Sequence, residues 1–171
     1  MSQSIEFVST YFTEEKIESL FFLLIGISSI LLALIFLFII KYSLYKGLAY
    51  PLLLIGILQV VVGISIYIRS PKDIIRVGQL IQNEPQNIQS NEIIRIDQVI
   101  DNFTTYLCIE MSLIIISLSL YIYFYKSPQT FWKGVALGLL IQASLLLPLD
   151  LVAKQRAHSY HDALIYFVQK Q

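Results

Sequence analysis

The sequence has little cysteine and no excess of either charge, and both features exclude classes of function. Cys108 is the only cysteine, so the chain cannot form an intramolecular disulfide, a redox-active thiol pair or a zinc site built on cysteines. Lysine and arginine total 12 residues, and aspartate and glutamate also total 12. Because proteins that bind nucleic acid usually carry an excess of basic charge, we expect no nucleic-acid partner.

The short signatures of common enzymes are also missing. The sequence contains no GxSxG nucleophile motif, no HExxH zinc motif, no Walker loop and no GxGxxG dinucleotide motif. We therefore expect no catalytic residues and no cofactor.

Apolar residues are abundant and lie in four long blocks. They make up 56% of the chain and charged residues only 14%, which is far from the average of globular proteins. At about 1.5 Å per residue, a block of 22 residues covers about 33 Å, enough for a hydrocarbon layer about 30 Å thick. The sequence therefore predicts an all-α, polytopic membrane protein, a bundle of four transmembrane helices within a single domain, residues 1–171. The predicted spans are residues 19–40, 47–68, 104–125 and 131–151.

Three further segments outside the spans have apolar residues at helical spacing. Residues 71–83 follow Ser70, which has the sequence pattern of a helix N-cap because proline comes next. Residues 91–103 lead straight into the third span, and residues 154–169 continue the fourth. We expect these segments to cover one another and form a small extramembrane helical cap on the bundle. The alternative is that their apolar faces lie on lipid headgroups.

Both termini and the cap lie on one side of the membrane if the chain crosses it four times. Lys41 and Lys46 after the first span outnumber Lys16 before it, which favours termini on the outer, periplasmic side. Arg69 and Arg76 just after the second span argue for the opposite orientation.

Small residues mark where the spans can pack closely, because helices in lipid associate through close backbone approach and hydrogen bonds. They recur every seven residues on the second span and in GxxxG spacing on the fourth, so these two spans are predicted to form the packing centre. The same spacing is compatible with a homo-oligomer. The residues are Ala49, Gly56 and Gly63 on the second span and Gly134 and Gly138 on the fourth.

Glu110 lies about 9 Å inside the third span, where a charged side chain is costly. It shares a helix face with Ser117, and this face can meet Gln59 and Gln142 on the second and fourth spans. One interpretation is a carboxylate that responds to protons or cations. The other, which the pattern favours, is a protonated or interface-reaching glutamate that hydrogen-bonds the bundle together.

Other polar candidates lie outside the apolar blocks. His158 and His161 are three residues apart and, with Asp162, resemble metal ligands weakly; we interpret them as solvated residues and expect no metal. Glu92 precedes Arg95 by three residues, which is typical of local helical pairing. The charged candidates are Arg95, Asp97, Asp101, Asp150 and Arg156.

Parts of the sequence resemble small four-span proteins of bacterial inner membranes. The resemblance rests on the run of residues 131–143, on Glu92 with Arg95, and on Asn102 and Phe103 ahead of Tyr106 and Glu110. It covers most of the chain, implies a bacterial inner-membrane location and brings no assigned activity. The membrane enzymes of eicosanoid and glutathione metabolism also have four spans, but their arginine-rich motif has no counterpart in residues 47–68.

From these observations we expect a small integral membrane protein that binds another protein, as an accessory subunit, a scaffold or an immunity protein against a membrane-targeting toxin. One alternative is an oligomeric pore or a proton- or cation-linked carrier, in which Glu110 faces water and Gln59 and Gln142 line the path. Another is a membrane enzyme acting on a lipid or quinone at the tyrosine and histidine surface of residues 158–162.

Overall fold

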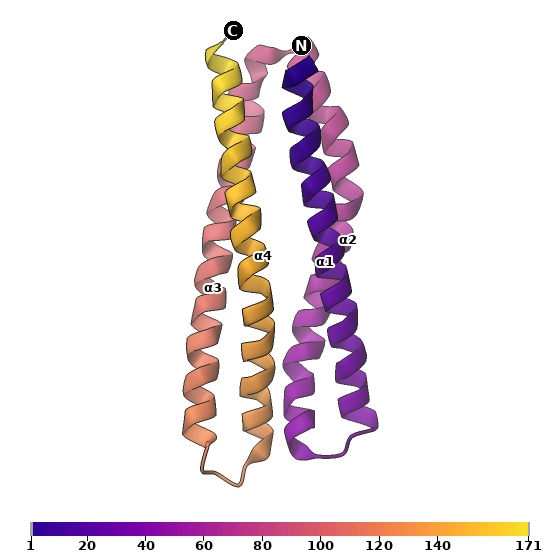
Figure 1. Ribbon diagram of the computed structural model, residues 1–171, viewed down its shortest axis with the longest axis vertical. Coiled ribbons are helices and arrows are strands. Elements are labelled where there is room, and N and C mark those ends of the chain that lie inside the picture. Colours follow the sequence, from indigo (N-terminus) through magenta and orange to yellow (C-terminus); the bar gives the residue numbers. More distant parts are fainter. Residues whose placement is uncertain (1, 171) are drawn as a thin grey trace.

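Four long helices make up nearly all of the protein. A computed structural model describes residues 2–170, and side chains from residue 6 to residue 170. Each of the four helices is long and apolar enough to cross a membrane, so the prediction of an all-α chain with four such helices is confirmed (Figure 1). The helices are α1 (Ser2–Phe38), α2 (Ser43–Asn83), α3 (Ile94–Phe124) and α4 (Thr130–Gln169).

The helices run up and down, with two short turns at one end of the molecule. At the other end lie both chain termini and the connection from α2 to α3 (Figure 1). This connection contains a 3-10 turn, η1 (Pro85–Asn87), and a π-helical turn, η2 (Gln89–Ile93), that leads directly into α3. α2 ends at Asn83, and the backbone of Glu84 leaves the helical region (φ -139°, ψ 56°), as is common for a residue that precedes proline.

α2 runs without a break through Ser70 and Pro71. The Ser70 hydroxyl lies 2.8 Å from the Ile66 carbonyl oxygen one turn earlier and 3.0 Å from the Glu15 carboxylate on α1. Ser70 is therefore an interior helix residue, and the prediction that it caps a separate helix is wrong. Serine followed by proline is typical of a helix start, but here packing against neighbouring helices keeps Pro71 inside a longer helix.

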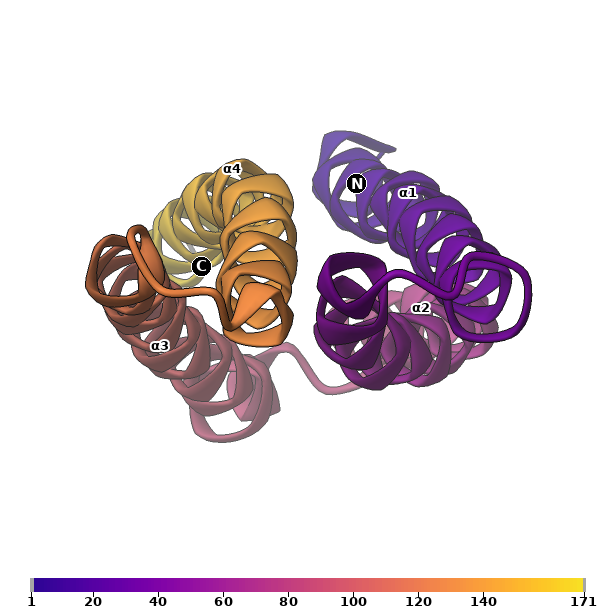
Figure 2. The same cartoon turned by 90° about the horizontal axis from the view of Figure 1, so that it is seen from below.

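The four helices form two hairpins that meet along α2 and α4. α1 packs on α2 and α3 packs on α4, so α2 and α4 occupy the centre and α1 and α3 lie outside them (Figure 2). Glycines bring the central pair together. A β-carbon at Gly134 would lie only 1.9 Å from the carbonyl oxygen of Leu44, and one at Gly47 only 2.0 Å from that of Phe131.

The small residues noted in the sequence lie at two different seams. Gly134 and Gly138 face α2, where a β-carbon on Gly138 would lie 2.8 Å from the Leu48 carbonyl oxygen. Gly56 and Gly63 instead face α1, and Ala49 is buried in a small cluster with Ala33 of α1. The second span therefore uses small residues against both of its neighbours.

The end of the molecule that holds both termini has its own apolar core. We call this part the head and define it as residues 2–18, 69–103 and 152–170. All four helices and η2 contribute, so the apolar faces of the three amphipathic segments cover one another. The N-terminal part of α1, which was not among the predicted cap segments, completes this core. The buried residues are Val8, Tyr11, Phe12, Val77, Ile81, Ile88, Ile93, Ile96, Ala157, Tyr160 and Leu164.

Candidate functional site

A fully buried carboxylate lies at the centre of the head. Glu92, in η2, is completely shielded from solvent, and three side chains from three helices bind it. Arg95 approaches to 2.6 Å, Arg76 of α2 to 3.2 Å, and the Tyr160 hydroxyl of α4 donates a hydrogen bond of 3.0 Å. A buried charge is tolerated only when it is paired and hydrogen-bonded, so Glu92 ties η2, α2, α3 and α4 together.

The charges continue from Glu92 across α2 to α1. Arg76 also pairs with Asp73 at 3.0 Å, and Asp73 pairs with Arg69 at 3.2 Å. Arg69 then reaches Glu15 on α1 at 2.7 Å. Positive and negative groups alternate along this row, so each buried carboxylate meets at least one arginine. Arg69 and Arg76 are about half exposed, so water and salt screen the part of their charge that faces outward.

A second ion pair joins α1 to α4. Arg156 binds Glu18, and both side chains are nearly buried. Burial raises the pKa of Glu18 above its usual value, although the Arg156 charge and hydrogen bond oppose this effect. Arg156 also lies over the Tyr11 ring, 5.7 Å from its centre, where a cation is attracted by the π electrons.

Two stacked tyrosines link the ion pairs to the apolar core. The rings of Tyr11 on α1 and Tyr160 on α4 are nearly parallel, with centres 4.1 Å apart. Burial, followed by the charge of Glu15, raises the pKa of Tyr11 to about 12. Burial also raises the pKa of Tyr160, and the negative charge of Glu92 adds to this effect. Both phenols therefore stay protonated at any physiological pH.

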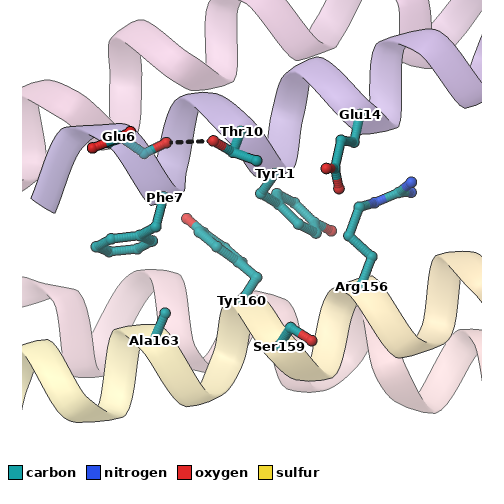
Figure 3. A pocket seen from close by; sticks show the side chains of 9 residues that line it. All are labelled: Glu6, Phe7, Thr10, Tyr11, Glu14, Arg156, Ser159, Tyr160 and Ala163. Atoms are coloured by element: carbon teal, nitrogen blue, oxygen red, sulfur yellow. Dashed lines mark hydrogen bonds between the residues drawn. The ribbon is translucent and has the colours of Figure 1, made fainter. Parts of the chain in front are cut away.

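A groove between α1 and α4 opens beside these tyrosines (Figure 3). Its volume is about 380 Å³, and Figure 3 shows Phe7, Tyr11 and Tyr160 along its floor. Glu6 and Glu14 stand on the α1 side and are exposed. Within the described part of the chain neither of these two carboxylates forms an ion pair, whereas Arg156 is already bound to Glu18. The groove thus combines aromatic surface with free negative charge.

The polar side chains inside the predicted spans have different partners from those we expected. Gln142 donates a hydrogen bond of 2.8 Å to the Ser29 hydroxyl on α1 and accepts one of 3.1 Å from Gln59 on α2. These three buried side chains tie α4 to α1 and α2. Glu110 is not part of this group, so the expectation that it meets Gln59 or Gln142 is wrong. Gln59 and Gln142 face each other within one chain, and the Gln59 Oε1 atom is buried without a hydrogen-bond partner in the described residues.

Glu110 faces the fourth helix instead. It is only 5% exposed, and its carboxyl group meets that of Asp150 on α4, which is 7% exposed. Ser117, on the same face of α3, is fully buried and donates its hydrogen bond to the Ile114 carbonyl oxygen at 2.8 Å. Glu110 and Asp150 were separate candidates in the sequence, and the structure brings them together.

The remaining candidates lie on the surface of the head. His161 contacts Asp97 and Asp162, each at 3.3 Å, while His158 and Asp101 are exposed. Residues 2–170 contain no group of three or more histidine, cysteine, aspartate or glutamate side chains placed to hold a metal ion.

The polar contacts that join the helices of the head were not predicted from the sequence, although most of its apolar core residues lie on the predicted amphipathic segments. Glu92 was interpreted only as a local partner of Arg95, because Arg76 and Tyr160 are distant in sequence and approach it only after folding. The spacing of Glu15 and Glu18 could have indicated that they form ion pairs with other helices. They are acidic residues three apart at the start of a long apolar helix, where they can face basic residues of neighbouring helices.

Comparisons with protein-family models, with curated proteins and with solved structures gave no match. The resemblance to four-span proteins of bacterial inner membranes therefore stays a prediction.

Proposed function

We propose that the chain is an integral membrane protein with four transmembrane helices and that its head binds another protein. Large apolar side chains are exposed along the predicted spans, among them Leu24 at 63%, Leu54 at 66% and Ile115 at 62%. Exposed apolar surface of this extent is unfavourable in water and suits a lipid environment. This supports insertion of the helices and leaves the head as the part that meets water.

The observation that carries the proposed binding role is the groove between α1 and α4. Phe7 is only partly buried and offers apolar and π surface, Tyr11 and Tyr160 lie almost completely buried behind it, and Glu6 and Glu14 add negative charge at the edge. This chemistry fits a partner segment that carries an arginine or lysine next to an apolar side chain. Arginine and aromatic residues are the side chains that most often anchor protein interfaces.

The floor of the groove is also held in place before any partner arrives. Tyr160 is fixed by its hydrogen bond to Glu92 and by stacking on Tyr11, and Phe7 lies 5.9 Å from the Tyr160 ring. A surface that needs no reordering loses less conformational entropy on binding. An accessory subunit, a scaffold and an immunity protein all require such a surface, and we propose that the chain has one of these three roles.

Site-specific photo-crosslinking tests the proposal. A photoreactive residue replaces Ser159, which lines the groove, and in a matched control it replaces Ile75, which is exposed on α2 of the head. We expect a defined adduct from position 159 only. Reversing the edge charges with Glu6→Lys and Glu14→Lys should then remove that adduct, because the partner segment is proposed to be cationic.

Three outcomes would contradict the proposal. Equal adducts from positions 159 and 75 would show that the groove has no special role. An adduct that persists after charge reversal would show that the groove does not select a cationic segment. An adduct with the mass of two copies of this chain would indicate self-association and would also count against a separate partner.

A further inference from the structure

A second site lies where α3 and α4 meet, at the head end of the predicted spans. Glu110 is inside the third span and Asp150 is at the end of the fourth, and their carboxyl groups face each other. Both side chains are more than nine-tenths buried. One oxygen of Glu110, Oε2, is buried without any hydrogen-bond partner in residues 2–170.

Two adjacent buried carboxyl groups cannot both be ionised without a nearby cation. Burial disfavours each charge, and the like charge of the neighbour disfavours it further. Neither group takes part in an ion pair within the described residues, in contrast to Glu92 and Glu15, which face arginines. A shared proton removes the repulsion and supplies the donor for a hydrogen bond between the two carboxyl groups.

The surroundings of the pair contain one further ion pair. On α1, Glu18 is close enough for the charge of Asp150 to act on it, and Glu15 lies next to Glu18. On α4, Lys154 comes one helical turn after Asp150 but forms no ion pair with it in the described residues, and Arg156 binds Glu18. On α3, Arg95 binds Glu92, and on α2, Arg69 binds Glu15. These three arginines are therefore engaged elsewhere.

We propose that Glu110 and Asp150 form a proton-binding site at the head end of the predicted spans. The two carboxyl groups share one proton and release it as the pH rises. The exchange needs only a proton and no other reactant. Because α3 contacts the rest of the chain mainly through α4, loss of this proton weakens the attachment of α3 at this level.

Infrared spectroscopy of the full-length protein in lipid tests the proposal. A protonated carboxyl group gives a C=O stretching band that disappears when the group ionises. We expect such a band at neutral pH, and we expect it to be lost at alkaline pH. Glu110→Gln and Asp150→Asn should each move the loss of the remaining band to a lower pH, by about tenfold in proton concentration, because each removes a like-charged neighbour.

The control is Asp101→Asn, which removes an exposed acid from the same helix and should leave the band unchanged.

Three results would overturn the proposal. The first is the absence of any protonated band assignable to either residue in the wild-type protein. The second is a Glu110 band whose pH dependence is unaffected by Asp150→Asn, which would mean an isolated buried glutamate. The third is a shift of the wild-type transition with sodium concentration at constant ionic strength, which would mean that the pair holds a metal cation. The third needs only the wild-type chain, so it decides the question even where a variant does not fold.

Discussion

The stability of the head depends most strongly on one residue, Glu92. Its carboxylate is completely buried and neutralises two arginines, Arg76 and Arg95. Removing one member of a buried ionic group is costly because the others stay buried without a partner, whereas the complete group is close to neutral in its net contribution. The role of Glu92 is therefore to fix the arrangement of helices in the head.

We expect Glu92→Gln to lower the free energy of unfolding by about 3 kcal/mol, since it leaves Arg95 without its counter-charge and Arg76 with Asp73 alone. Chemical unfolding of the detergent-solubilised protein, followed by circular dichroism, measures this. Glu84→Gln is the matched control, because Glu84 is exposed and bonds only to its neighbour Asn87. Equal stability of the two variants would show that the Glu92 ion pairs do not hold the head.

The buried tyrosine Tyr11 makes the head sensitive to alkali. Its pKa is raised from 10.0 to about 12 by burial and by the charge of Glu15, so the folded state keeps this proton to a higher pH than the unfolded state does. The unfolded state then gains stability as the pH rises, and the free energy of unfolding falls between pH 10 and about 12. The full contribution of Tyr11 corresponds to roughly 3 kcal/mol.

Tyr11→Phe should make the fall of stability with alkaline pH less steep, which unfolding curves at a series of pH values measure. Tyr166→Phe serves as the control because the Tyr166 ring is 66% exposed, and it should behave as the wild-type protein does. Parallel pH dependence of all three proteins would contradict a proton held on Tyr11.

At the scale of the helices, close contact between α2 and α4 depends on glycine. A methyl group on Gly134 has no room, because the backbone of α2 is in its place. Gly78, in the head part of α2, has open space around its α-carbon. The two positions therefore respond in opposite ways to the same substitution.

Gly134→Ala should lower the free energy of unfolding by about 1–3 kcal/mol, as overpacking generally does, because it forces α2 and α4 apart. Gly78→Ala should raise helix stability by up to about 1 kcal/mol, since alanine favours the helix more than glycine does. Thermal unfolding in the same detergent compares the two variants. A Gly134→Ala protein as stable as Gly78→Ala would show that the two hairpins do not pack as described.

The helices also show which local signals are reliable. Apolar length predicted four long helices, because a run of this length has no alternative in a compact chain. The Ser70-Pro71 signal failed because a proline within a helix costs only local hydrogen bonding, and here contacts with Glu15 and the surrounding helices outweigh that cost. A sequence signal from one or two residues does not end a helix when the packing of that helix favours its continuation.

For the molecule as a whole, both termini and the α2–α3 connection lie at one end and both short turns at the other. If the four helices cross the membrane, these two ends face opposite compartments.

We expect a Gln86→Cys variant and a Lys126→Cys variant, each made in a Cys108→Ser background, to react with an impermeant thiol reagent from opposite sides. Labelling in sealed vesicles and in spheroplasts measures this, and labelling of both from the same side would contradict four crossings. The side that reaches position 86 also decides between periplasmic and cytoplasmic termini.

The fold was therefore more predictable than the site. Apolar periodicity located the helices, and the polar residues Glu110, Gln59 and Gln142 stood out because they interrupt apolar surroundings. Their partners did not stand out, because which residue meets which depends on how α1 packs on α2 and α3 on α4. For the same reason Glu92 looked like an ordinary surface acid, although folding buries it completely.

The way Glu92 is bound has a consequence for synthesis of the protein. Its first two partners, Arg76 and Arg95, are near it in sequence, but the Tyr160 hydroxyl that completes its hydrogen bonding comes from the last part of α4. The emerging chain cannot complete the binding of this carboxylate until translation has passed Tyr160. A chain that stalls earlier keeps a solvated negative charge at the centre of an open head, and this defect distinguishes it from the finished protein.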